Sequence, residues 1–225
     1  MHIDRRFARL ALLLGLMLPL ACVNPFKPAN PEPPAPGGVP EFFSSPELVL
    51  DTMDRAIESK SSGGADAWLH AFAQSTQAGD RAFRAFYDDA VKRSWEDKEG
   101  PAPEPWDVTL ERGLPSKLFS ISPNASYTFK WAGDPSAESD GVPGGSPDTV
   151  QFHRMYTLSA TSANSSKPET IAIGFCDLSF QNTNGRWSIF RWNDRVDPAV
   201  GVTPGNPSTN QRTMTWWRLE SRKRQ

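Results

Sequence analysis

Cysteine and histidine are scarce in this chain, which has two cysteines and three histidines among its 225 residues. Cys22 lies near the start, while Cys176 lies inside an apolar run, where we expect a small buried side chain rather than a reactive thiol. Two cysteines in such different parts of the chain can form neither a disulfide framework nor a cysteine-based metal site. Because His70 and His153 are the only histidines after the first two residues, we expect no transition-metal site and no cofactor.

Positive charge is also limited. The formal net charge is −2, and the basic residues gather only in the tail from Arg218 to Arg224, which we expect to be solvated. Nucleic acid is therefore not an expected partner, because binding phosphates along a strand needs a basic face. The sequence also lacks a nucleophile elbow, a glycine-rich phosphate loop and paired metal-ligand spacing.

Only one long apolar run occurs, from Leu10 to Leu20, and it follows three arginines. As a helix it would be roughly 17 Å long, too short for the ~30 Å hydrocarbon core of a membrane, so it is typical of an export signal. The residues Leu18 to Cys22 resemble the lipobox of bacterial lipoproteins, in which the cysteine is lipidated and the signal peptide is removed. Pro19 departs from that pattern, whose position three before the cysteine is usually leucine.

This resemblance implies a signal peptide over 1–21, palmitate or a similar acyl group on Cys22, and attachment to a bacterial cell envelope, with the outer membrane favoured over the inner. Proline and glycine then dominate 22–41, which predicts an extended tether up to roughly 60 Å long. We expect one domain over 42–220 and a basic tail over 221–225.

Helical spacing of apolar residues begins after the tether. Ser44-Ser45-Pro46-Glu47 supplies a serine cap and a first-turn proline, which predicts a helix over 46–60. A second helix is expected near 65–75, after a serine and glycine break. Residues 80–99 fit a helix and a strand equally, and a short helix is expected to end at Gly113.

Beyond residue 124 the apolar period falls to two, which predicts strands. They contain Tyr127 to Trp131, Val150 to Leu158, Ile171 to Phe180 with a bulge at Cys176-Asp177, Trp187 to Arg191, and a last strand over 212–219. Asn184-Gly185 predicts a tight hairpin turn. Helices followed by strands with short connections predict an antiparallel α+β domain with the helices on one face.

The late segment Gly185 to Asp194 strengthens this interpretation, since it carries Gly185, Trp187, Ile189, Trp192 and Asp194. That spacing, together with the order of elements over 42–219, resembles the nuclear-transport-factor-2-like (SnoaL-like) fold. The resemblance implies N-terminal helices packed on a strongly curved antiparallel sheet, which together form a cone. It implies little about chemistry, because this fold carries isomerases, dehydratases, hydrolases and purely binding domains.

The chain is rich in aromatic residues, including eight tryptophans. Most of these rings are expected in the core, but some are candidates for lining an open cone mouth: Trp131, Phe152, Tyr156, Phe175, Trp187 and Trp192. We therefore expect a non-catalytic domain that binds a partner protein or a small apolar ligand, with a homodimer left open. The alternative is an enzyme of the same fold that performs acid/base chemistry with Asp107, His153 or Tyr156.

The remaining charged residues have simpler interpretations. Asp107 and Glu111, four residues apart, are expected on a solvated helix face. We expect a structural ion pair such as Arg154 with Asp194. His153 is expected on the strand face opposite Phe152, as a structural or exposed residue.

Overall fold

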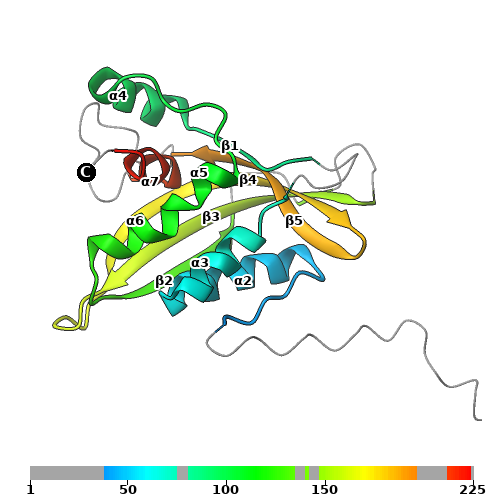
Figure 1. Ribbon diagram of the computed structural model, residues 1–225, viewed down its shortest axis with the longest axis horizontal. Coiled ribbons are helices and arrows are strands. Elements are labelled where there is room, and N and C mark those ends of the chain that lie inside the picture. Colours follow the sequence, from blue (N-terminus) through cyan, green and yellow to red (C-terminus); the bar gives the residue numbers. More distant parts are fainter. Residues whose placement is uncertain (1–37, 75–80, 135–139, 142–146, 197–211, 224–225) are drawn as a thin grey trace, which may run out of the picture. The chain divides into compact units, whose positions relative to one another are not determined.

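The computed structural model describes residues 38–74, 81–134, 140–141, 147–196 and 212–223 (Figure 1). The expected signal peptide, Cys22 and the tether up to residue 37 lie outside these residues. In chain order the elements are α2 (Pro46–Ser59), α3 (Ser62–His70), β1 (Arg84–Phe86), α4 (Asp89–Glu99), α5 (Val108–Glu111), α6 (Gly113–Ile121), β2 (Ser126–Gly133), β3 (Thr149–Thr161), β4 (Glu169–Thr183), β5 (Arg186–Arg195) and α7 (Met214–Glu220).

The strands form one sheet in the order β1-β5-β4-β3-β2. Short β1 runs parallel to β5, whereas the other neighbours are antiparallel. Figure 1 shows α2, α3 and α6 covering one face of this curved sheet. The predicted α+β class, with N-terminal helices on a curved antiparallel sheet, is confirmed, except that the pairing of β1 with β5 is parallel.

The first helices confirm the sequence interpretation closely. Helix α2 occupies 46–59, and the Ser45 side chain accepts a hydrogen bond from the Leu48 N–H at its start. Helix α3 begins at Ser62, earlier than expected, because Ser61 caps it by accepting from the Gly64 N–H. The ambiguous stretch 80–99 contains both predicted structures, strand β1 and then helix α4.

The hairpin between β4 and β5 is confirmed as well. Asn184 and Gly185 both have positive φ, at 54° and 85°, the conformation that asparagine and glycine adopt at least cost. The bulge expected at Cys176-Asp177 is wrong: the register of β4 against β5 shifts between Ser179 and Phe180 instead. Cys176, Leu178 and Phe180 all lie on the inner face of β4 at regular alternate positions, so the strand does not change face at Cys176-Asp177.

The strand expected over 212–219 is wrong, because this segment forms helix α7. The Thr213 hydroxyl accepts from the Trp216 N–H at its start. The buried residues Met214, Trp217 and Arg218 follow the i, i+3, i+4 spacing of a helix, a signal that the adjacent tryptophans obscured. Helix α6, which begins at Gly113, was not predicted.

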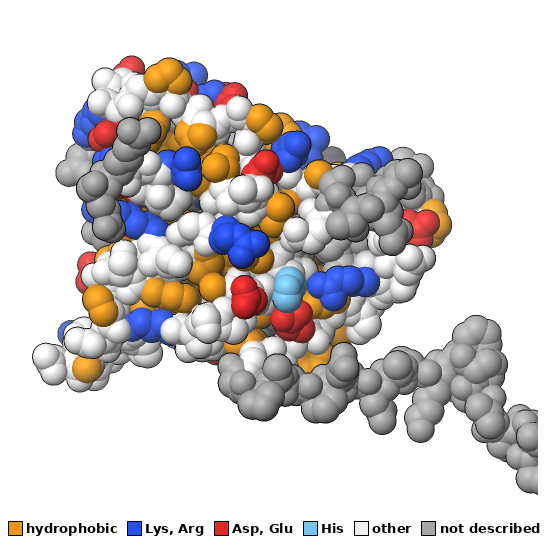
Figure 2. Space-filling model, viewed as in Figure 1, with side chains coloured by type: hydrophobic (Ala, Val, Ile, Leu, Met, Phe, Trp, Pro, Cys, Tyr) orange, Lys and Arg blue, Asp and Glu red, His pale blue; other side chains and the backbone are white. Residues whose placement is uncertain are grey.

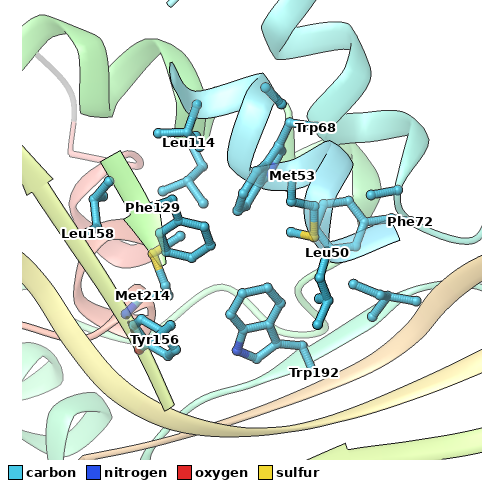
Figure 3. Close-up of a cluster of buried hydrophobic side chains, with 14 of the residues drawn as sticks. Leu50, Met53, Trp68, Phe72, Leu114, Phe129, Tyr156, Leu158, Trp192 and Met214 are labelled. Carbon is cyan, nitrogen blue, oxygen red and sulfur yellow. Dashed lines mark hydrogen bonds between the residues drawn. The ribbon is translucent and has the colours of Figure 1, made fainter. Parts of the chain in front are cut away.

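The core lies between the helices and the inner face of the sheet. Figure 3 shows Phe129, Tyr156 and Trp192 from the strands directed toward Met53 and Trp68 of the helices, among other core side chains. Contact with this core starts as early as Val39, which is 9% exposed.

Candidate functional site

Trp192 lies at the centre of the inner aromatic cluster. It is fully buried, and its ring centroid lies 5.7 Å from that of Trp131, 6.0 Å from that of Tyr156 and 6.5 Å from that of Trp68. The Tyr156 ring meets Trp192 edge to face and the other two rings meet it at a tilt, so together they fill the space between sheet and helices. The centre of the domain is therefore packed with side chains.

The six expected lining residues fall into three groups. Phe152, Tyr156 and Trp192 are buried core residues, and Trp131 and Trp187 are partly buried and pack against that core. Phe175 is buried but pairs with Met155 at an outward-facing position of β4. Three surface hollows are lined by described residues only, and none of these three is lined by any of the six. An open mouth lined by them stays a prediction.

A buried ion pair joins α5 to α7. Arg218 donates from Nε to Glu111 Oε2 at 2.9 Å and from Nη2 to Oε1 at 3.1 Å, and both side chains are fully buried. The indoles of Trp68 and Trp106 donate to the same carboxylate at 3.2 and 2.6 Å. The solvated helix face expected for Glu111 is wrong, as is the solvated tail expected for Arg218, because the fold places the two charges together inside.

The arrangement of four donors on one carboxylate explains how a charge can be buried here. Glu111 accepts hydrogen bonds on both oxygens, while the Arg218 guanidinium lies 4.4 Å from the centre of the Trp192 ring. Burial of a charge is tolerated when it is paired and hydrogen-bonded in this way. The pair therefore connects α3, α5, α7 and β5 through one buried polar centre.

A second buried polar group forms around Asp194. Tyr156 donates to Asp194 Oδ1 at 2.6 Å, the Thr215 N–H donates to Oδ2, and the Met214 N–H donates to the Tyr156 hydroxyl at 2.8 Å. Burial raises the pKa of Asp194, and burial also raises the pKa of Tyr156. This group holds the start of α7 on the sheet.

Gly174 makes room for that contact. A Cβ built there would lie 2.5 Å from the Tyr156 hydroxyl oxygen, so a larger residue would displace the tyrosine. The ion pair expected between Arg154 and Asp194 is wrong, because Arg154 binds Asp140 at 2.7 Å. In the sheet register Cys176 separates Arg154 from Asp194, and the Arg154 guanidinium lies over the Phe152 ring at 4.2 Å.

The three residues of the enzyme alternative do not meet. Asp107 caps α5, accepting from the N–H groups of Thr109 and Leu110. His153 pairs through Nδ1 with Asp177 at 2.7 Å on the outer face of the sheet, as expected from its parity. Tyr156 is held inside by Asp194. Each therefore has a structural partner, and no dyad forms among them.

Sequence reasoning missed Asp54, on α2. Its Oδ1 is buried and has no hydrogen-bond partner among the described residues. Burial raises its pKa from 3.8 to about 7, and the Lys130 charge opposes only part of that rise. The Trp131 indole lies close enough to act on the same carboxyl group. The sequence did not single out Asp54, because a lone aspartate in an amphipathic helix is usually exposed. Its burial depends on how α2 packs against β2, which the sequence alone does not give.

A surface hollow of about 450 Å³ lies beside β1. Its floor includes Ala85 and Trp106, whose backbones form an isolated antiparallel β-bridge. Its wall includes Phe86, which is 47% exposed. Lys92 and Glu104, paired at 2.5 Å, form part of the rim. An apolar floor with a charged rim, at this volume, is typical of sites for small ligands.

Figure 2 shows charged side chains of both signs scattered over the viewed face of the molecule, with hydrophobic side chains between them. Among the described residues, no group of three or more His, Cys, Asp or Glu side chains is placed to hold a metal ion. None of the helices in the described part of the chain is long and apolar enough to cross a bilayer.

Solved structures that match the chain share its arrangement of elements. They include an NTF2-like protein with a cystatin-like fold from Novosphingobium aromaticivorans (10% identity, 67% of this chain and 79% of that one, TM-score 0.44). Others are a form of Rv3472, a protein of unknown function from Mycobacterium tuberculosis (11%, 78% and 84%, TM-score 0.47), and ActVI-ORFA from Streptomyces coelicolor (5%, 65% and 90%, TM-score 0.43). No family model and no curated protein matches the sequence. At these identities the likeness concerns the fold alone.

Proposed function

We propose that this protein is a lipid-anchored protein of a bacterial cell envelope, whose α+β domain binds a small apolar ligand or an apolar side chain of a partner without catalysing a reaction. The observation that carries the binding role is Phe86. Only two large apolar side chains are markedly exposed among the described residues, Phe86 and Ile121, and Phe86 lines the hollow beside β1. An exposed ring at a concave apolar surface is a typical contact for a ligand.

The polar groups of the interior support the absence of catalysis. Glu111, Arg218, Tyr156 and Asp194 each contact other buried groups of the protein. A general acid or base must instead reach a proton of the substrate.

The binding role is tested with N-phenyl-1-naphthylamine, a neutral apolar dye whose fluorescence rises on burial. We expect saturable binding, weakened about fivefold by Phe86→Ser, since loss of a partly exposed ring contact removes about 1 kcal/mol. Ile121→Ser is the matched control, because Ile121 is 38% exposed and lies outside the hollow. Equal effects of the two substitutions would remove the hollow from the proposal.

Asp54 favours a second candidate function, acid/base catalysis inside the domain. A carboxyl group with a pKa about 7 is suited to proton transfer near neutral pH. A substrate must then reach it, and a carbodiimide with an amine nucleophile tests this at pH 6. We expect labelling at Asp54 and none at the fully buried Asp194. Absence of label on Asp54 would exclude this candidate.

A further inference from the structure

A second hollow, of about 270 Å³, is lined by residues of β3, β4 and β5 together with Arg81, and it shares no lining residue with the apolar one. Its lining includes two arginines, Arg81 and Arg191, together with Gln151, Ser179 and Phe190. The functional proposal above uses none of these residues.

The sheet register places these polar side chains in a row. Arg191 of β5 lies opposite Ser179 of β4, and Ser179 lies opposite Gln151 of β3. On its other side, Arg191 lies opposite Arg84 of β1. Directly paired residues share a face, and neighbouring strands are about 4.8 Å apart. The outer face therefore carries a row of two arginines, a hydroxyl and an amide.

The arginines at this place differ from the others nearby. Arg154, Arg195 and Arg218 each bind at least one carboxylate. Arg81 and Arg191 instead stack on phenyl rings, at 4.9 Å over Phe190 and 4.6 Å over Phe86, and neither forms an ion pair among the described residues.

Adjacent like charges on a sheet are unfavourable unless something neutralises them. Arg84 and Arg191 are such a pair, and within the described part of the chain the Arg84 guanidinium donates only to the Phe83 carbonyl, at 3.0 Å. Arg191 donates from Nε to Asn193 Oδ1 at 3.0 Å, and the rings below Arg81 and Arg191 hold the two guanidiniums without using their remaining N–H donors. Unsatisfied donors and excess positive charge together favour an anion.

We propose that this hollow binds a phosphate monoester group. Its charge near −2 matches two guanidiniums, whose planar forks suit phosphate oxygens. The Ser179 hydroxyl and the Gln151 amide supply further donors at the same rim. The group belongs either to a soluble phosphorylated molecule or to a lipid headgroup, and the chemistry that recognises it is the same.

Calorimetric titration at constant ionic strength tests the site, with phenyl phosphate as ligand and chloride as reference. We expect saturable binding of phenyl phosphate that Arg81→Gln or Arg191→Gln weakens by at least about tenfold, because each removes a charge-assisted contact. Arg55→Gln is the matched control, since its guanidinium also stacks on a ring, 5.1 Å from the centre of Phe42, but lies outside the hollow. Absence of binding, or an equal loss in the control, overturns the proposal.

Vesicles distinguish the two sources. The chain with Cys22→Ser is sedimented with phosphatidylcholine vesicles that contain or lack phosphatidic acid. Binding that needs both phosphatidic acid and Arg191 assigns the lipid headgroup, whereas phenyl phosphate binding without vesicle binding assigns a soluble ligand. Arg191 stacks on Phe86, which lines the apolar hollow, so Arg191→Gln affects both sites. Arg81→Gln separates the two proposals, because Arg81 stacks on Phe190 instead: it should weaken phenyl phosphate binding and leave binding of the neutral dye unchanged. If Arg191→Gln fails to fold by circular dichroism, Arg81→Gln alone decides the outcome.

Discussion

Replacing Arg218 by methionine removes the cation that pairs with the buried Glu111 carboxylate. Methionine keeps much of the side-chain length while it deletes both hydrogen bonds, at 2.9 and 3.1 Å. Two indole donors remain, from Trp68 and Trp106. They cannot neutralise the charge, so the fold must bury an unpaired carboxylate or break open around it.

Breaking a buried ion pair in this way costs about 3–5 kcal/mol, against a total stability of about 5–15 kcal/mol for a domain. At about 2–4 °C per kcal/mol, the melting temperature should fall by about 10 °C. Arg112→Met is the control, because Arg112 is exposed at the end of α5 and makes no side-chain capping bond. We expect it to change the stability by less than about 0.5 kcal/mol.

Urea unfolding followed by tryptophan fluorescence and circular dichroism measures these changes. The double variant Glu111→Leu with Arg218→Met should lose clearly less than the sum of the two single losses, since it removes both buried charges together. The reasoning is refuted if Arg218→Met lies within 1 kcal/mol of the wild type, or if the two substitutions are additive.

Three other outcomes are expected. Burial raises the pKa of Asp54 from 3.8 to about 7, so the folded state holds the Asp54 proton more tightly than the unfolded state does. This stabilisation is present below pH 3.8 and is lost as the pH rises to 7, by about 2 kcal/mol after allowance for the partial exposure of Asp54. Asp54→Asn should flatten this pH dependence of the stability, measured by urea unfolding at a series of pH values. Trp192→Ala should cost about 3–5 kcal/mol by urea unfolding and the partly buried Trp187→Ala clearly less, and the reverse order would contradict the assignment of Trp192 to the centre of the core. Cys22→Ser should move the protein from the membrane to the soluble fraction on centrifugation, and unchanged partition would exclude the lipid anchor.

Local signals in the sequence predicted the local structure well. A serine cap and a first-turn proline specified where α2 begins, and Asn184-Gly185 specified the hairpin, because each acts through the backbone of its own neighbours. Helix α7 was missed although Thr213 offered a cap. Its tryptophans resembled the aromatic residues of the strands, and the flanking pattern did not separate a period of two from one of 3.6.

The candidate site was predicted less well, because it depends on contacts between distant segments. Asp107 and Glu111 looked equivalent in the sequence, but Asp107 caps a helix while Glu111 is fully buried. The row of polar side chains on the outer face comes from four strands, and sequence alone does not give their register.

The sequence by itself determined the α+β class, most element positions and the aromatic core, since hydrophobic periodicity and capping act within a few residues. Only the tertiary structure decided which charges are buried. Glu111 and Arg218 are 107 positions apart, and each alone is a typical solvated residue. Burying either one is unfavourable until the fold supplies the other, so the property belongs to the pair and not to either stretch of sequence.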